Sequence, residues 1–290
     1  MHIKNLQESF RFLRKNPILY LPDILMTAVT SILLYYLYLY TNASGFLALF
    51  QSTELASFEL IKVFLSENLK EIIISAVTFF LVTFIFGVGV IIFKFSMIRE
   101  MLIGKKISLI NSWKERRGFF WPVVFLRVIV YFLSLISIII VSVISLGVYF
   151  LLFSLNENLA LWLAFAVWII LGILVLIYIK LAILFRYPIM FLKQTKQPIQ
   201  IIKESYKALK EQPKYLLETW LIVIVLTIIF WAINYILGTL IEMSLSFLSI
   251  ITLVTILSLL WRIINILIGI TVDIWTTIYV FLRFKEKTKQ

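Results

Sequence analysis

Six long apolar runs constrain this chain more than any other feature of its sequence. The hydrocarbon core of a bilayer is about 30 Å thick and an α-helix rises about 1.5 Å per residue, so one crossing needs about 20 mostly apolar residues. The composition agrees, because 62% of the 290 residues are hydrophobic and only 14% are charged, against roughly a quarter in soluble domains. We therefore predict an all-α integral membrane protein that forms a single polytopic domain, 1–290. Its six spans are expected near residues 18–40, 72–97, 120–144, 159–185, 215–240 and 263–284.

Basic residues gather in four short segments that alternate with the apolar runs. These segments are the N-terminus, 98–118, 186–214 and the C-terminal tail, and together they hold 21 basic and six acidic residues, a net charge of +15. The intervening loops hold three basic and six acidic residues, a net charge of −3. Since Lys and Arg are retained on the cytoplasmic side, both termini are predicted to lie in the cytoplasm and the protein in the cytoplasmic membrane. The charge is explained by orientation and does not indicate nucleic acid.

Several kinds of chemistry are excluded by the residue types present. The chain has no cysteine, so disulfides, thiolate metal sites and cysteine nucleophiles are impossible. We expect its single histidine, His2, to lie on a mobile terminus, which leaves no histidine for a metal site or a catalytic triad. No phosphate-binding loop or nucleophile motif is found either. We predict no cofactor, no metal and no enzymatic activity.

A stretch of basic sequence with a proline at its end recurs along the chain. Four residues of the first copy return 196 positions later: Glu8, Ser9, Leu13 and Pro17 correspond to Glu204, Ser205, Leu209 and Pro213. A weaker copy begins at Ser112. Each copy is predicted to form a basic amphipathic helix on the cytoplasmic surface, followed by two spans. The chain then contains two or three parallel units, at approximately 1–104, 105–196 and 197–290.

The faces of these surface helices follow from the spacing. Apolar residues three and four apart are expected to form the buried face, namely Ile3, Leu6, Phe10 and Leu13 in the first copy and Ile199, Ile202, Tyr206 and Leu209 in the last. Basic residues on the other face are candidate contacts to anionic lipid: Arg11, Arg14, Lys114, Arg117, Lys207 and Lys210. Docking of a partner protein is the alternative use of the same motif. Pro17, Pro122 and Pro213 are each expected to turn a surface helix into a span.

Six ionisable residues lie inside the predicted spans, where each costs about 2.5–3.5 kcal/mol on insertion scales. They are three acids and three bases: Asp23, Lys94, Arg127, Lys180, Glu218 and Asp273. One interpretation is a polar cavity, open to the cytoplasm, that binds a charged headgroup or an ion. The other is a set of ion pairs that hold the units together. Asp273 lies deepest and is the strongest functional candidate.

Two longer connections remain open. Residues 41–71 are expected to include a short helix on the outer surface. Residues 241–261 are apolar and form a helix extension, an interfacial segment or a re-entrant segment. Between the third and fourth spans, Asn156, Glu157 and Asn158 are predicted to form a tight turn.

The order of helix, Ser-aromatic-basic triplet, proline and span, with Phe185, Arg186, Tyr187 and Pro188 closing a span, resembles one group of polytopic proteins. That group is the membrane domain ahead of some glycerophosphodiester phosphodiesterase catalytic domains, with its stand-alone relatives in bacteria and archaea. The catalytic domain and its acidic metal ligands have no counterpart in these 290 residues. The resemblance therefore implies a membrane module and assigns no enzymatic role.

Three functional hypotheses follow. The first is a non-enzymatic module that handles or organises lipid or serves as a transport-associated subunit, with anionic lipids and an ATPase or another membrane protein as partners. The second is a small carrier or channel that uses the charged layer as its pathway. The third is a membrane-embedded enzyme that acts on lipid through its intramembrane carboxylates.

Overall fold

The computed structural model describes residues 2–41, 62, 66–154, 156–246 and 251–288, and within these residues it contains helices and no strands. Most of the short helix predicted in 41–71 falls outside the described residues. In chain order the helices are α1 (His2–Lys15), η1 (Pro17–Tyr20), α2 (Leu21–Tyr40), α5 (Leu69–Leu102), α6 (Leu109–Phe153), α7 (Glu157–Ala182), α8 (Arg186–Leu192), α9 (Pro198–Glu211), α10 (Pro213–Ser246) and α11 (Ile251–Lys287).

The prediction of six long apolar helices is confirmed. Six segments of the described chain are long and apolar enough to cross a membrane, and each overlaps one predicted span: Pro17–Tyr40, Leu69–Leu102, Arg117–Phe153, Glu157–Leu192, Pro213–Ile241 and Val254–Lys287. Of the three alternatives for 241–261, the structure has the helix extension, because α10 continues to Ser246 and α11 already begins at Ile251. Asn156 caps α7 by accepting a hydrogen bond from the backbone N–H of Leu159, as suits the predicted turn.

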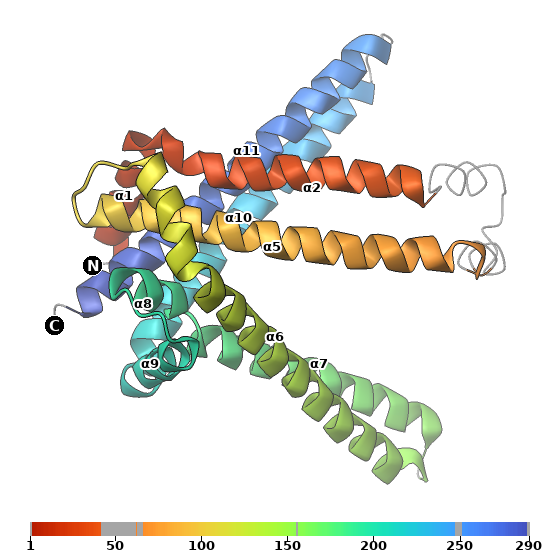
Figure 1. The fold of residues 1–290 in the computed structure, drawn as a ribbon. Helices are drawn as coiled ribbons and strands as arrows, with labels where there is room; N and C mark the ends of the chain where they lie inside the picture. Colours follow the sequence, from red (N-terminus) through yellow and green to blue (C-terminus); the bar gives the residue numbers. More distant parts are fainter. Residues whose placement is uncertain (1, 42–61, 63–65, 155, 247–250, 289–290) are drawn as a thin grey trace.

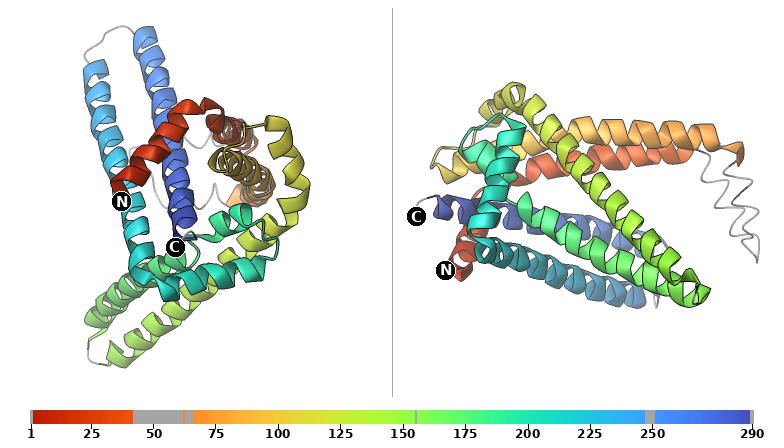
Figure 2. Two further views of the ribbon diagram at one scale, coloured as in Figure 1. Left: turned by 90° about the vertical axis from the view of Figure 1, so that its left-hand side faces the viewer. Right: turned by 90° about the horizontal axis from the view of Figure 1, so that it is seen from below.

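Three helical hairpins make up the molecule. Helix α2 packs on α5, α6 on α7 and α10 on α11, and the three pairs meet at one end and diverge toward the other (Figure 1). Both chain termini lie at the joined end, where the short helices α1, α8 and α9 cross the hairpins (Figure 2). The four basic segments of the sequence therefore all lie at this end.

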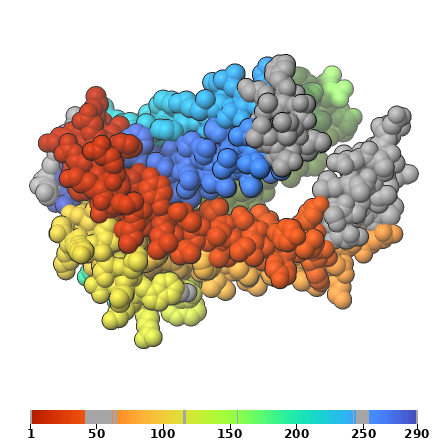
Figure 3. Space-filling model, turned by 90° about the horizontal axis from the view of Figure 1, so that it is seen from above, coloured from red at the N-terminus to blue at the C-terminus, as the bar shows by residue number. Residues whose placement is uncertain are grey.

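The joined end holds the buried core. It is built mainly from the second halves of α5 and α11 and from α8, with further residues of α6 and α9, and in it Phe95 contacts Tyr187, Phe191 and Phe281 with ring centroids 4.6–5.6 Å apart. The diverging halves of the hairpins instead expose large apolar side chains, and Figure 3 shows a gap between the outer half of α2 and α11. Such extensive exposed apolar surface is stable in lipid and not in water.

Two prolines end surface helices as predicted, but the third does not. Pro17 begins η1 and Pro213 begins α10, so α1 and α9 are separated from the spans that follow. Pro122 lies inside α6, which is 45 residues long and continues on both sides of the proline, so the predicted break there is wrong. A proline removes one hydrogen bond, here to the carbonyl of Gly118, and a long helix tolerates that loss when the turns on both sides keep theirs.

The packed face of the surface helices also differs from the expected one. In α1 the buried residues are Asn5, Ser9 and Leu13, whereas Ile3 and Phe10 are 71% and 47% exposed. In α9 the buried face is likewise centred on a serine, Ser205. A small serine lets the helix approach the core closely, and Ser9 satisfies its hydroxyl locally by donating to the carbonyl of Leu6 at 2.8 Å. Leu13 and Leu209 are buried as expected, whereas Ile3 and Ile199 are left on the outer side of their helices.

Candidate functional site

Lys94 is a buried cation held by two carboxylates from different hairpins. Its Nζ lies 2.9 and 3.1 Å from the two carboxylate oxygens of Asp23 in α2, and 2.6 Å from Oδ2 of Asp273 in α11. The Lys94 side chain is 8% exposed and that of Asp23 is 16% exposed, whereas that of Asp273 is 63% exposed. Lys94 therefore ties the first hairpin to the third, with one acid enclosed and the other open to a cavity.

Arg127 lies at the interface between α5 and α6. It donates hydrogen bonds to the carbonyl of Phe84 (3.2 Å) and to the hydroxyl of Tyr131 (3.1 Å), and its guanidinium lies 4.8 Å from the centre of the Phe84 ring. Gly87 makes this position possible, because a Cβ there would lie 3.0 Å from Nη1 of Arg127. Two of the five N–H groups of Arg127 are thus engaged with neutral groups, and the others remain available.

A cavity of about 390 Å³ opens beside these residues, within the ~300–1,000 Å³ typical of small-molecule sites. It lies between α5, α6, α7, α8 and α11, and its charged lining residues are Lys94, Arg127, Lys180, Arg186 and Asp273. Asp23 contacts Lys94 from outside this lining. The four bases Lys94, Arg127, Lys180 and Arg186 outnumber the two acids Asp23 and Asp273, which leaves two positive charges in excess.

Three of the four bases have no acidic partner. Within the described part of the chain, no carboxylate pairs with Arg127, Lys180 or Arg186, although Arg186 lies 4.7 Å from the centre of the Tyr187 ring. Arg127 and Arg186 are half-buried and Lys180 is exposed, so their positive charges face the cavity without a compensating carboxylate, and this arrangement favours an anion there. Guanidinium groups can bind two oxygens of a phosphate or carboxylate at once, and lysines add point charges.

The six residues of the predicted charged layer are therefore not one cluster. Five lie in or against the cavity: Asp23, Lys94, Arg127, Lys180 and Asp273. Glu218 lies elsewhere, with Oε2 3.1 Å from Nε2 of His2. His2 is not a mobile terminal residue as expected, because it belongs to α1 and its Nδ1 also lies 2.8 Å from the hydroxyl of Tyr279.

Sequence reasoning missed Arg186 and Arg283. Both were counted as cytoplasmic charges, although Arg186 belongs to the Phe-Arg-Tyr-Pro stretch that carried the resemblance. Arg283 is 1% exposed; it pairs with Glu286 at 3.1 Å, donates to Thr219 at 3.2 Å and lies 3.8 Å from the centre of the Tyr215 ring. Charge counting places a residue near an interface, but it does not reveal whether the side chain turns inward.

The six candidate lipid contacts are exposed at the joined end on α1, the start of α6 and α9: Arg11, Arg14, Lys114, Arg117, Lys207 and Lys210. Lys207 pairs with Glu211 at 3.6 Å, and Lys210 lies 5.0 Å from the centre of the Tyr206 ring. On the same helix, a hydrogen bond from Lys193 lowers the pKa of Glu204, so this carboxylate stays charged. The solvated faces of these helices thus keep their basic character.

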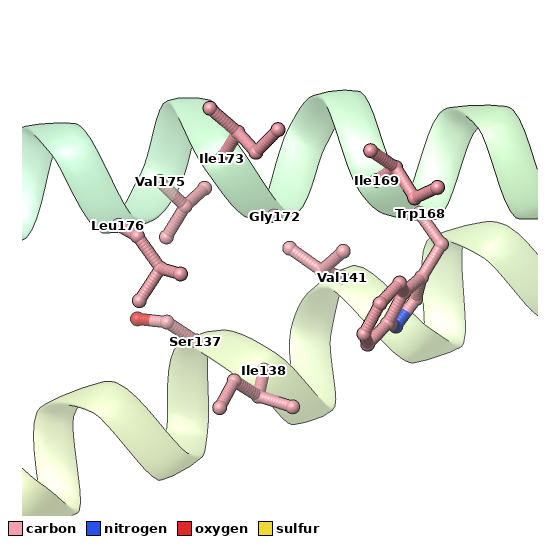
Figure 4. A pocket seen from close by; sticks show the side chains of 9 residues that line it. All are labelled: Ser137, Ile138, Val141, Trp168, Ile169, Gly172, Ile173, Val175 and Leu176. Carbon is pink, nitrogen blue, oxygen red and sulfur yellow. The ribbon is translucent and has the colours of Figure 1, made fainter. Parts of the chain in front are cut away.

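A second cavity lies between α6 and α7 and is apolar. It measures about 200 Å³, and no charged side chain lines it (Figure 4). At its far end the indole N–H of Trp168 donates to the hydroxyl of Ser142 at 3.1 Å, which joins the two helices. Among the described residues there is no group of three or more His, Cys, Asp or Glu side chains that could hold a metal ion.

Comparisons of the chain with protein-family models, with curated proteins and with solved structures gave no match. The resemblance to the membrane domain of glycerophosphodiester phosphodiesterases remains a prediction.

Proposed function

We propose that this protein is a non-enzymatic membrane module that handles or organises lipid, and that its cavity holds the anionic headgroup of a membrane lipid. One observation carries the proposal: three bases without acidic partners, Arg127, Lys180 and Arg186, face a single cavity between the hairpins. An anionic headgroup would offset the positive charge that lines this cavity.

A lipid suits the cavity better than a soluble anion because of what surrounds it. The hairpins diverge from the cavity with exposed apolar side chains, so any ligand there is flanked by hydrocarbon on one side and by the basic joined end on the other. Basic groups near a membrane surface each attract anionic lipid by about 1 kcal/mol.

The same proposal includes the orientation and the internal repeat. We place the joined end in the cytoplasm, on the strength of the charge count. Each hairpin follows a helix or helix start that carries a fully buried serine, Ser9, Ser112 or Ser205, which supports three parallel units. The outward apolar residues Ile3 and Ile199, 71% and 64% exposed, suit amphipathic helices that rest on the membrane.

The experiment is lipid analysis of the purified protein. The wild-type protein in mild detergent should retain anionic phospholipid, and Lys180→Gln should retain about tenfold less, because a hydrogen bond to a charged group contributes roughly 1.5–3 kcal/mol. The matched control is Lys203→Gln, an exposed base on α9 outside the cavity. Equal retention by both variants, or no anionic lipid on the wild-type protein, would contradict the proposal.

A further inference from the structure

We infer that the cationic cavity and the apolar groove between α6 and α7 form one site for a single phospholipid, with its phosphate in the cavity and one acyl chain in the groove. This inference rests on the proposed function and names the ligand class more narrowly. The inference requires that the two spaces adjoin each other, that their combined length suits an acyl chain, and that their lining residues match the polar and apolar parts of a phospholipid.

The two spaces adjoin each other, because Leu176 lines both of them. On α6 the lining residues repeat with the three- and four-residue spacing of a helix turn, which places them on one face of the helix. They pass from the cavity into the groove in the order Arg127, Val130, Tyr131, Ser134, Ser137, Ile138 and Val141. The matching face of α7 runs from Lys180 and Ile179 to Ile169 and Trp168.

The length of this path suits an acyl chain. Arg127 and Val141 are 14 residues apart on one helix, which is about 21 Å at ~1.5 Å per residue. One leaflet occupies half of the ~30 Å hydrocarbon core, or about 15 Å. A chain that starts beside Arg127 therefore reaches through its leaflet along the groove, and Trp168 closes the far end by its hydrogen bond to Ser142.

The chemistry changes along the path as it does along a phospholipid. The cavity offers guanidinium and ammonium groups for a phosphodiester, and the groove is lined by aliphatic side chains, one indole and Ser137 (Figure 4). At about 200 Å³ the groove lies below the ~300 Å³ at which independent small-molecule sites begin, so it suits an extension of the larger cavity.

Gly172 offers a direct test of the groove. A Cβ at this position would meet no atom within 4 Å, so a larger side chain can project into the groove without displacing the protein. Gly147 on α6 is equally unobstructed but does not line the groove. Gly172→Phe and Gly147→Phe are therefore matched, and both replace glycine in a helix by a residue of higher helix propensity.

The probe is a phosphatidylglycerol with a photoreactive diazirine on one acyl chain, added to the full-length protein in detergent. After illumination we expect adducts on the segment 168–176 of the wild-type protein and of Gly147→Phe. Adducts there should fall about tenfold in Gly172→Phe, because the new ring occupies the space of several methylene groups. They should fall in Lys180→Gln as well, since the phosphate positions the chain.

The outcomes separate the two proposals. Adducts that persist in Gly172→Phe, or that spread evenly over the exposed apolar surfaces, overturn the chain site; the headgroup site still stands if Lys180→Gln loses retained lipid. If Lys180→Gln keeps both its retained lipid and its adducts, the headgroup site fails, and the single combined site fails with it.

Discussion

At the scale of single residues, Lys94 is held by two acids in different environments. Asp23 is enclosed with Lys94, whereas Asp273 faces the cavity and is solvated there when the cavity is wet. An enclosed pair costs about 3–5 kcal/mol when one partner is removed, whereas an exposed pair contributes about 0–1 kcal/mol. The two acids should therefore differ in their effect on stability although they bind the same ammonium group.

The first prediction follows from this difference. Asp273→Asn should lower the free energy of unfolding in detergent by about 1 kcal/mol or less, and Asp23→Asn by more. The double variant should lose more than the sum of the single changes, because only then is Lys94 left without a carboxylate. Melting temperatures of the three variants test this. Additive effects would mean that Lys94 has another partner or is hydrated.

Gly87 gives a second prediction at this scale. In Gly87→Val the side chain would displace the Arg127 guanidinium, which lies 3.0 Å from the Cβ position, and would break its hydrogen bond to Phe84. We expect a loss of about 1–3 kcal/mol in stability, as for overpacked sites, and weaker retention of anionic lipid. Gly269→Val is the control, because a Cβ at that position meets nothing within 4 Å. Equal melting temperatures for the two variants would contradict the proposed role of Gly87.

At the scale of helices, α1 is attached to the third hairpin by specific contacts. Trp275 of α11 donates from its indole N–H to the carbonyl of Leu6 at 3.1 Å and packs edge-on against Phe10, with ring centroids 5.5 Å apart. Asn5 of α1 also donates to Glu286 of α11 at 2.8 Å. A surface helix that only rested on lipid would lack these contacts, so α1 is part of the folded protein.

The third prediction tests this attachment. Trp275→Phe keeps a ring against Phe10 but removes the hydrogen bond to Leu6, at a cost of about 1 kcal/mol. Hydrogen exchange in α1 should become several times faster, while exchange in α9 stays unchanged. Trp231→Phe is the matched control, since Trp231 is 72% exposed and contacts Tyr235 on its own helix. Unchanged exchange in α1 would show that other contacts hold this helix.

The sequence predicts some of these elements better than others, for identifiable reasons. Pro17 and Pro213 were read correctly because a proline at the start of a helix is compatible with the missing N–H. The helix break predicted at Pro122 is wrong, because a proline inside a long helix is preceded and followed by the same kinds of residues as a proline at a helix start. The face of α1 is predicted only in part: Leu13 is buried as expected, but Ile3 lies on the outer side, because the outer surface of a membrane protein is apolar too.

At the scale of the whole molecule, the number of spans follows from length and apolarity, but their arrangement does not. In a run that is apolar all round, periodicity does not show which face meets protein. The divergence of the hairpins and the meeting of Lys94 with Asp273, 179 positions away, were therefore beyond the reach of the sequence. The sequence nevertheless identifies five residues at the cavity, because an ionisable side chain inside a span carries a free-energy cost that needs an explanation.

The fourth prediction concerns orientation. The chain has no cysteine, so single cysteines report their own position. A membrane-impermeant maleimide should label Glu157→Cys at the far end of the second hairpin in intact cells, and should label Thr288→Cys only after permeabilisation. Lys105→Cys, at the joined end, should behave like Thr288→Cys. Labelling of Thr288→Cys in intact cells would reverse the proposed orientation.

The unbroken course of α6 gives the second hairpin a mechanical property. Its 45 residues extend for about 67 Å, more than twice the thickness of the hydrocarbon core, so one continuous helix begins at the basic joined end and finishes at the hairpin tip. Helices α1 and α9 instead end just before Pro17 and Pro213, so each is a separate helix from the span that follows it. In α6 a displacement of the surface end, near Trp113 or Lys114, would be passed along the same helix to the part that forms one wall of the groove. Whatever binds the surface end of α6 would thereby change the width of the groove.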